Sequence, residues 1–362
     1  MNRLCYCTNV HPAEDLAGVI AQLDRYAVPV REKLGVDRLG IGLWLAADVA
    51  AGLAAAGRSV RRKLRVELEA RGLGIITMNA FPYGGFHADV VKRSVYEPRW
   101  TDPRRLQYTL GCVAVLDDIL SDDVAYGSIS TLPLGWREPW TEADDTASLD
   151  ALAELTRALR SCSNVMKLAV EPEPGCVLDT VADTVAWLAP RVDPDHIGLC
   201  LDTCHLAVSF ADPAGTVRSI AEAGLEVVKV QASSALHVAE PKAARAELRE
   251  FVEPRYLHQV RELSPDGTVL KADDLPEAFE TLPGEGPWRV HFHVPLHAAP
   301  EEPLASTNDV ITEVLRVVPP DRTVEVETYT WNVLPERHRQ DLVDGIAAEL
   351  AWADRQLTLE VQ

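Results

Sequence analysis

The sequence of 362 residues predicts a (β/α)8 barrel. Short runs rich in β-branched and aromatic residues alternate with amphipathic stretches, which favours βα units and a parallel sheet. Most of these runs are apolar at odd and even positions alike, as in strands that are buried on both faces. Successive runs begin roughly 30 to 50 residues apart, the length of one βα unit with its loops. Eight such units close a barrel.

The predicted strands follow one another along the whole chain. They cover residues 4–10, 39–45, 74–80, 125–131, 167–171, 197–202, 226–231 and 323–329. Leucines at helical spacing within 149–159 and 342–352 indicate two of the intervening helices. We expect residues 1–362 to form a single barrel domain.

A ninth strand-like run, WRVHFHV at 288–294, lies in the longest interval between predicted strands. The same interval holds a charged helical stretch at 243–251 and a short run, YLHQV, at 256–260. We interpret residues 232–300 as an insertion after strand seven, in which YLHQV and VHFHV pair as a hairpin over the barrel mouth. The alternative is an open sheet of nine βα units.

Composition excludes several classes of protein. Thirty-five basic against 55 acidic residues give a net charge of −20, which disfavours binding to nucleic acid or to anionic membranes. The seven cysteines, an odd number, fit reduced buried thiols better than a disulfide framework. No signal peptide and no apolar run of roughly 18 residues is found, so we expect a cytoplasmic protein without membrane insertion.

Acidic side chains follow three of the predicted strands. Glu171, Asp202 and Glu327 lie at the carboxyl ends of strands five, six and eight, where a barrel of this type places its site. Each alone is compatible with a helix cap or a surface group. Together they would repel one another unless a divalent cation compensates them. With the imidazole of His205 and the amide of Gln231, they form an oxygen and nitrogen set suited to Mn, Mg, Co or Zn.

These strand ends resemble a known family. The motifs VEPEPG, LDTCH and VEVET, in this order on strands five, six and eight, resemble the xylose isomerase-like TIM barrels. That superfamily includes sugar isomerases, keto-sugar 3-epimerases, inosose dehydratases and the endonuclease IV type. Further stretches across nearly the whole chain are similar to the EboE-type metabolite traffic proteins: FPYGGFH, VYEPRWTDPRRLQYT, STLPLGW, EPRYLHQV, WRVHFHVPL and VEVETYTWNVLP.

The resemblance implies one divalent ion held by Glu171, Asp202 and Glu327. In the epimerases a histidine on strand seven completes the ligand set, and this chain has Gln231 at that position. The fourth ligand is therefore either Gln231 or His293 from the insertion. Two histidines are implied to face the substrate, namely His205 of the Asp-x-x-His motif and His291 of the insertion, and His297 lies behind His291 in the sequence.

The implied reaction is an isomerisation or epimerisation of a sugar or cyclitol. Glu171 and Glu327 would act as paired acid and base at the carbon next to a carbonyl, which the metal polarises. The expected partner is a small polyol, keto-sugar or cyclitol, held by polar and aromatic groups. The substrate-binding candidates are Asn79, His87, Trp136, His205, His291 and Tyr329, with Phe81, Tyr83 and Trp331 near them. The basic segment 92–105 either binds a phosphate or carboxylate of the substrate or is a solvated loop.

Two other functions are compatible with the resemblance. A non-catalytic metabolite-binding or traffic protein would keep the barrel and the metal, and the absent strand-seven histidine favours this reading slightly. An endonuclease IV-like phosphoesterase is the weaker alternative, because that chemistry uses a three-metal site richer in histidine and the net charge of −20 opposes DNA. A homo-oligomer is compatible with the sequence.

Overall fold

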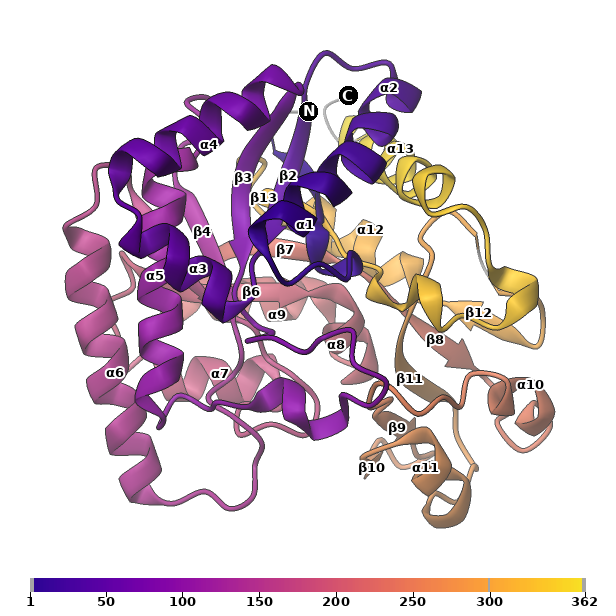
Figure 1. Cartoon of the computed structure of the whole chain (residues 1–362). Helices are drawn as coiled ribbons and strands as arrows, with labels where there is room; N and C mark the ends of the chain where they lie inside the picture. Colours follow the sequence, from indigo (N-terminus) through magenta and orange to yellow (C-terminus); the bar gives the residue numbers. More distant parts are fainter. Residues whose placement is uncertain (1–2, 299, 360–362) are drawn as a thin grey trace.

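Eight parallel strands form a closed barrel in this computed structural model, which describes residues 3–298 and 300–359 (Figure 1). The order around the barrel is β1-β13-β7-β6-β5-β4-β3-β2. The strands are β1 (Leu4–Cys7), β2 (Leu39–Trp44), β3 (Leu73–Asn79), β4 (Gly127–Thr131), β5 (Met166–Val170), β6 (Ile197–Asp202), β7 (Val227–Ala232) and β13 (Thr323–Val326). Because β1 pairs with both β2 and β13, the barrel prediction is confirmed and the nine-unit open sheet is excluded.

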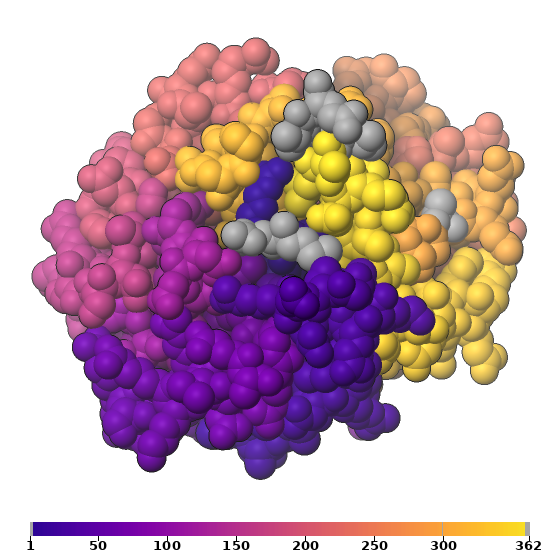
Figure 2. Space-filling model, turned by 90° about the horizontal axis from the view of Figure 1, so that it is seen from above, coloured from indigo at the N-terminus to yellow at the C-terminus, as the bar shows by residue number. Residues whose placement is uncertain are grey.

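Helices surround the barrel, and Figure 2 shows successive segments following one another around the molecule in chain order. The helices are α1 (Leu16–Gln22), α2 (Val28–Leu34), α3 (Ala47–Ala55), α4 (Arg58–Ala70), α5 (Pro103–Ile119), α6 (Glu142–Arg160), α7 (Val181–Leu188), α8 (Thr203–Val208), α9 (Pro213–Glu222), α12 (Asn308–Val317) and α13 (Leu342–Leu359). Local sequence explains where α6 and α7 begin. Thr141 forms a capping box with Asp144 at the start of α6, and Thr180 forms one with Asp183 at the start of α7.

The first and last barrel strands are shorter than predicted. The chain leaves β1 after Cys7 and forms a 3-10 turn over Thr8–Val10. It leaves β13 after Val326 and forms another 3-10 turn over Tyr329–Asn332. Asn9 and Glu327 therefore lie just beyond the strand ends, at the mouth of the barrel, rather than within the strands.

Between β7 and β13 the chain forms a second sheet, in order β10-β9-β11-β8-β12, beside the barrel (Figure 1). It consists of β8 (Ser234–Val238), β9 (Val260–Leu263), β10 (Val269–Ala272), β11 (Trp288–Val294) and β12 (Leu304–Ser306), with helices α10 (Arg245–Arg249) and α11 (Leu275–Thr281). Val290 pairs with Val260, so the two predicted runs do meet.

The structure nevertheless differs from the predicted two-stranded hairpin, because the two runs belong to a five-stranded sheet. β9 begins only at Val260, so most of the run 256–260 is loop. The strand β11 is buried at every residue except Arg289, which is half-buried, and it pairs with β8 on its other edge. A strand with so little exposed surface requires a neighbour on both edges, and β8 supplies the second one.

A buried ion pair lies inside the barrel. Lys229 on β7 and Glu325 on β13 have fully buried side chains, and the Lys229 Nζ lies 2.6 Å from the Glu325 Oε2. The Lys229 Nζ also lies 3.2 Å from the Ser130 hydroxyl. Gly42 provides the space, since a Cβ there would come within 1.5 Å of the Glu325 Oε1. Burial alone would lower the pKa of Lys229, but Glu325 outweighs it and raises that pKa.

Two further sequence predictions can be compared with the structure. All seven cysteines are free thiols, and only Cys162 is not fully buried. None of the helices in the described part of the chain has the length and apolar character that a bilayer crossing requires.

Removing the charge of Lys229 should destabilise the barrel strongly. We expect Lys229→Met to lower the free energy of unfolding by about 3–5 kcal/mol, because the Glu325 carboxylate would remain buried without its partner. The double variant Lys229→Met/Glu325→Met should lose less than half as much, because neither charge remains. Urea unfolding in the presence of a chelator measures both. Equal losses in the two variants would contradict this account of the pair.

Candidate metal centre

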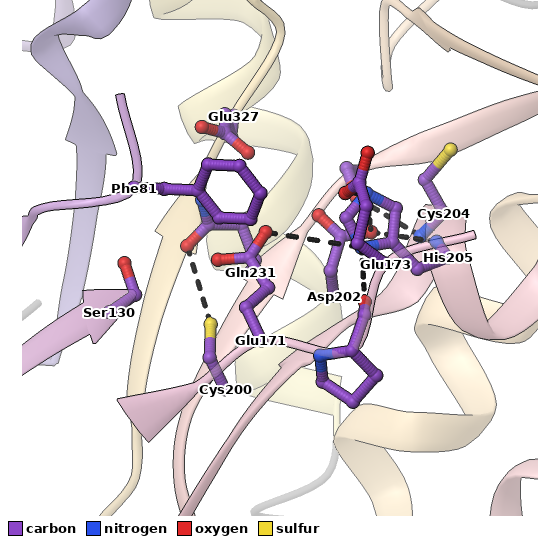
Figure 3. A network of polar contacts seen from close by, with 12 residues as sticks. Phe81, Ser130, Glu171, Glu173, Cys200, Asp202, Cys204, His205, Gln231 and Glu327 are labelled. Atoms are coloured by element: carbon purple, nitrogen blue, oxygen red, sulfur yellow. Dashed lines mark hydrogen bonds and ion pairs between the residues drawn. The ribbon is translucent and has the colours of Figure 1, made fainter. Parts of the chain in front are cut away.

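Three carboxylates from three different strands meet at the barrel mouth. Glu171 follows β5, Asp202 ends β6 and Glu327 follows β13, and one oxygen of each lies within 4.8 Å of the other two. All three residues are buried. Figure 3 shows Glu171 and Asp202 beside His205, with Glu327 close by. The structure thus brings together the three acidic residues that the strand ends predicted.

Mutual repulsion and burial make these carboxylates hard to ionise. Burial raises the pKa of Glu171 well above its usual value, and Glu327 raises it further. Burial and the charge of Asp202 raise the pKa of Glu327 to about 7, although Gln231 and Lys229 act in the opposite direction. A cation placed among the three carboxylates would remove this penalty.

The unpaired atoms of the cluster fit a divalent ion. Glu171 Oε2, Asp202 Oδ2 and His293 Nε2 are buried and have no hydrogen-bond partner. The His293 Nδ1 lies 2.7 Å from the carbonyl oxygen of Glu327, to which it donates, so its Nε2 carries a free lone pair. Buried acceptors without donors are costly unless something binds them. Their oxygen and nitrogen chemistry suits the metals that the sequence suggested.

The two candidates for the fourth ligand, His293 and Gln231, differ in the contacts that their side chains already make. His293 groups with Asp202 and His205, with one atom of each within 4.8 Å of the others. The amide oxygen of Gln231 accepts from the Cys200 thiol at 3.7 Å. The side chain of Gln231 also lowers the pKa of Glu327 by hydrogen bonding. The His293 Nε2 has no hydrogen-bond partner and the Gln231 amide oxygen has only the Cys200 thiol, so both side chains have an atom free to serve as the fourth ligand.

The Asp202 side chain caps helix α8 and also belongs to the carboxylate cluster, whereas the sequence was compatible with either role alone. Its Oδ1 accepts from the backbone N–H of His205 at 2.8 Å and caps helix α8. The same Oδ1 accepts from the Ser233 hydroxyl at 2.8 Å. Its other oxygen remains unpaired within the cluster. The cap fixes the side chain, so the free oxygen is held in place for a cation.

A second group of polar residues adjoins the carboxylates. The His205 Nε2 lies 3.0 Å from Glu173 Oε2 and 3.1 Å from the His291 Nε2. Burial would lower the pKa of His205, but Asp202 and Glu173 outweigh it and raise that pKa well above the usual value. Burial and the neighbouring His205 lower the pKa of His291. The pKa of His205 is thus raised and that of its neighbour His291 is lowered, so His205 holds a second ring proton more readily than His291.

These groups line a cavity with about 510 Å³ of empty space, including its opening to solvent. Its lining residues are Asn9, Asn79, Phe81, Pro82, Phe86, Lys92, Val95, Tyr96, Glu171, Glu173, His205, Tyr256, Leu257, His291, His293, Glu327 and Tyr329. Most of the substrate-binding residues proposed from the sequence are thus placed at one cavity.

Two proposed substrate contacts lie away from the cavity lining. His87 turns toward the barrel, where its Nε2 lies 2.6 Å from the Asn9 carbonyl oxygen, and its ring packs near Trp44. Trp136 lies between two guanidinium groups, those of Arg93 at 4.6 Å and Arg137 at 4.8 Å. Both side chains are taken up by packing contacts, of which those with Asn9 and Arg93 come from distant parts of the chain and that with Arg137 from the next residue.

The sequence analysis missed four lining residues that matter to the site. The Asn9 side-chain amide donates to Glu327 Oε1 at 2.6 Å, and that of Asn79 donates to the same oxygen at 3.1 Å. Glu173 accepts from the Tyr96 hydroxyl at 2.7 Å. Asn9 could have been found, because it is a polar residue at the end of a predicted strand. The missed residues are Asn9, Tyr96, Glu173 and Tyr256.

The basic segment 92–105 is engaged within the protein. The Lys92 Nζ donates to the Tyr256 carbonyl oxygen and to Asp274, each at 2.7 Å. The Arg105 side chain is fully buried and donates to backbone carbonyl oxygens, and burial lowers its pKa to about 10. Arg104 pairs with its neighbour Asp102. These cations stabilise loops and do not gather as a site for a substrate phosphate.

No protein-family model and no curated protein matches this sequence. Solved structures are similar in fold. A xylose isomerase-like TIM barrel protein from Mycobacterium smegmatis in complex with magnesium is 13% identical, with a TM-score of 0.57 over 99% of this chain and 98% of that chain. L-ribulose 3-epimerase is 13% identical, with a TM-score of 0.57 over 100% and 96%. The IolI protein with a bound zinc atom is 15% identical, with a TM-score of 0.52 over 99% of each chain.

The chain therefore has the xylose isomerase-like TIM-barrel fold, as the sequence motifs suggested. The identities of 13–15% show the fold and leave the activity to be argued from the site.

Helix α13 ties together the two segments that carry Glu327 and His293. Its buried Glu349 accepts from the Thr328 hydroxyl at 2.6 Å and from the backbone N–H of Leu296 at 3.0 Å. Burial raises the pKa of Glu349 to about 7. This carboxyl is therefore a structural clamp behind the site, and it holds its proton more tightly in the folded chain than in the unfolded one.

Replacing Glu349 should change how stability depends on pH. The folded state binds the extra proton between pH 4.5 and about 7, so the wild-type protein should lose stability as the pH rises through this window. We expect Glu349→Gln to remove a slope of up to about 1.4 kcal/mol per pH unit. Urea unfolding at pH 5 and pH 7.5, with exposed Glu222→Gln as the control, measures it. An unchanged slope in Glu349→Gln would refute the clamp.

Glu327→Gln should stabilise the metal-free protein at alkaline pH. Above about pH 7 the ionised Glu327 repels Asp202, and the amide removes this repulsion, so we expect a gain of about 1–3 kcal/mol at pH 8. The gain should vanish by pH 5, where Glu327 is already protonated. The same variant should lose most of the thermal stabilisation that Mn²⁺ or Zn²⁺ gives the wild type. A variant that is less stable at pH 8 but keeps its metal response would contradict the assignment.

Proposed function

We propose that this protein is a divalent-metal-dependent isomerase or epimerase that moves a proton next to the carbonyl of a sugar or cyclitol. The observation that carries the proposal is that two buried glutamates, Glu171 and Glu327, line one cavity together with unpaired ligand atoms suited to a cation. The similarity in fold to L-ribulose 3-epimerase is consistent with it.

Glu171, Asp202, Glu327 and His293 are the residues that would hold the ion. When bound, the metal would act as a Lewis acid on a carbonyl oxygen and its neighbouring hydroxyl. Mn, Mg, Co and Zn all suit this ligand set. The magnesium complex and the zinc-bound protein among the similar structures support this range of metals.

The chain itself would supply the acid and the base. In the metal-free protein burial and Asp202 raise the pKa of Glu327 to about 7, and a bound cation would lower it, so Glu327 would act as the ionised base. Asn9 and Asn79 both donate to its Oε1, so its Oε2 is the oxygen left to exchange a proton with the substrate. Glu171, with its raised pKa, would serve on the other side of the transfer.

His205 and His291 would bind and orient the substrate. The His205 Nδ1 donates to the Pro172 carbonyl oxygen at 2.7 Å and its Nε2 lies 3.0 Å from Glu173 Oε2, so both ring nitrogens are engaged and the ring would orient the substrate by its charge. The neutral His291 is held by Gln259, whose side-chain oxygen lies 2.8 Å from the His291 Nδ1. An oxygen-rich head group would thus find both a charged and a neutral imidazole in the cavity.

The stretches that are similar to EboE-type proteins suggest that the substrate is a small specialised metabolite. This part of the proposal rests on sequence resemblance. A phosphodiester in DNA is disfavoured as the substrate, because the net charge is −20 and the lining carries three glutamates.

Solvent exchange tests the proposal. Metal-replete protein in deuterated water, incubated with a panel of keto-sugars and inosose-type cyclitols, should introduce deuterium at one carbon of a substrate, detected by NMR or mass spectrometry. We expect Glu171→Gln and Glu327→Gln each to slow the exchange by about 10²–10⁴-fold, because each removes one proton-transfer group. The exposed Glu222→Gln variant is the control.

Exchange that persists in both glutamine variants would refute the assigned acid and base. A metal-binding protein that binds members of the panel tightly but exchanges none of them would instead be a non-catalytic metabolite carrier.

A further inference from the structure

The lining of the cavity has two chemically different parts. The ends of the barrel strands, helix α8 and strand β11 contribute polar groups: Asn9, Asn79, Glu171, Glu173, His205, His291, His293 and Glu327. The loop after β3, the start of the run 256–260 and the turn after β13 contribute mainly apolar groups: Phe81, Pro82, Phe86, Val95, Tyr96, Tyr256, Leu257 and Tyr329. The C–H face of a simple polyol can pack against an aromatic ring, but it covers only a part of this second surface.

Three of the apolar residues form one continuous aromatic wall, which we define as Phe86, Tyr256 and Tyr329. Their ring centroids lie 5.2 Å apart for Phe86 and Tyr256, 5.4 Å for Phe86 and Tyr329, and 4.9 Å for Tyr256 and Tyr329. Together with Trp44 and Val91 behind them, they belong to a buried cluster that is separate from the main hydrophobic core. The aromatic wall is therefore part of the cavity lining and is distinct from the hydrophobic core of the barrel.

The insertion after β7 holds this wall in place. The backbone N–H groups of Val91 and Lys92 both donate to the Arg255 carbonyl oxygen at 2.8 Å. The Tyr256 hydroxyl donates to the Phe86 carbonyl oxygen at 3.1 Å. The loop after β3 and the insertion are thus joined across the cavity, and the wall is built from both.

Two of the three tyrosine hydroxyls in the apolar lining, those of Tyr96 and Tyr256, are already engaged. The Tyr256 hydroxyl is used by Phe86, and the Tyr96 hydroxyl donates to Glu173 at 2.7 Å. Burial raises the pKa of Tyr256 to about 12, so its hydroxyl stays a protonated donor. A substrate hydroxyl placed against Phe86 or Leu257 would lose its water and gain no hydrogen bond in return, which is costly.

No free lysine or arginine lies among the cavity's described lining residues. Lys92 is the single Lys or Arg in the lining, and its Nζ donates to Asp274 and to two backbone carbonyl oxygens, those of Tyr256 and Glu253. A phosphate or carboxylate would therefore meet a lysine that is already neutralised, together with three glutamates in the same cavity. At the apolar part of the cavity, where Lys92 lies, this disfavours a phosphate substituent and favours an uncharged one.

We propose that the ligand of this cavity is a polyhydroxy carbonyl compound that carries an uncharged aromatic or alkyl substituent. This deepens the proposed function and rests on it for the polar head group, which the carboxylate and histidine part binds. The substituent lies against the aromatic wall and Leu257, where it removes apolar surface from water. The insertion contributes Tyr256 and Leu257 and is thus a specificity element.

Matched glycosides test this inference. Binding of methyl and phenyl β-glycosides of 3-keto-glucose and 3-keto-galactose, and of 3-keto-glucose 6-phosphate, is measured by calorimetry on the full chain loaded with Mn²⁺ or Zn²⁺. We expect at least one phenyl glycoside to bind about 10-fold or more tightly than its methyl counterpart, and the phosphate to bind no more tightly than the methyl glycosides.

Leu257→Gln should reduce the phenyl preference by about 3-fold or more, and because Leu257 is only partly buried the variant should fold. Val252→Gln is the matched control, since Val252 is an exposed apolar residue of the same insertion and does not line the cavity. Equal binding of methyl and phenyl probes, no binding of any phenyl probe, tighter binding of the phosphate, or an unchanged preference in Leu257→Gln would each overturn the inference.

The outcome is separable from that of the proposed function. Proton exchange on an unsubstituted keto-sugar without any phenyl preference would overturn this inference and leave the proposed reaction standing. A phenyl preference in a protein that exchanges no proton would support the apolar subsite and count against the reaction.

Discussion

The structure depends on how a barrel accommodates carboxylates inside its walls. Four acidic side chains, Glu171, Asp202, Glu325 and Glu327, are buried at or below the mouth. Ionised groups in such surroundings need a compensating charge. Lys229 provides one and is paired with Glu325 at 2.6 Å. The other three carboxylates lie within reach of one another and have no lysine or arginine of their own, so their charge balance calls for a cation.

The rest of the fold serves to position this cluster. Parallel strands bring Asp202, Gln231 and Glu325 into neighbouring register, so residues from distant parts of the chain meet at one level of the barrel. The insertion then adds His291 and His293 from β11, and helix α13 joins the segments behind them through Glu349. A barrel without the insertion would offer the carboxylates but neither these two histidines nor the aromatic wall.

The division of the cavity into a polar and an apolar part has a physical origin. The polar groups come mainly from strand ends, whose backbone is fixed by the barrel hydrogen bonds. Much of the apolar surface comes from loops that pack against each other, as Phe86 does against Tyr256 at 5.2 Å. In the proposed function, proton transfer would therefore fall to the rigid part of the fold, and recognition of the ligand to loops that can vary without disturbing the barrel.

The sequence by itself determined the barrel, its strands and the acidic residues Glu171, Asp202 and Glu327 at their ends, because strand periodicity is local and a parallel barrel places all carboxyl ends together. Tertiary structure alone decided which loop side chains face the cavity. His293 points its free nitrogen at the cluster because the Glu327 carbonyl oxygen holds its other nitrogen, a contact across 34 residues. His87 and Trp136, equally plausible in sequence, are held elsewhere by Asn9 and by two arginines. The direction of a loop side chain depends on partners far along the chain, and no local pattern specifies those partners.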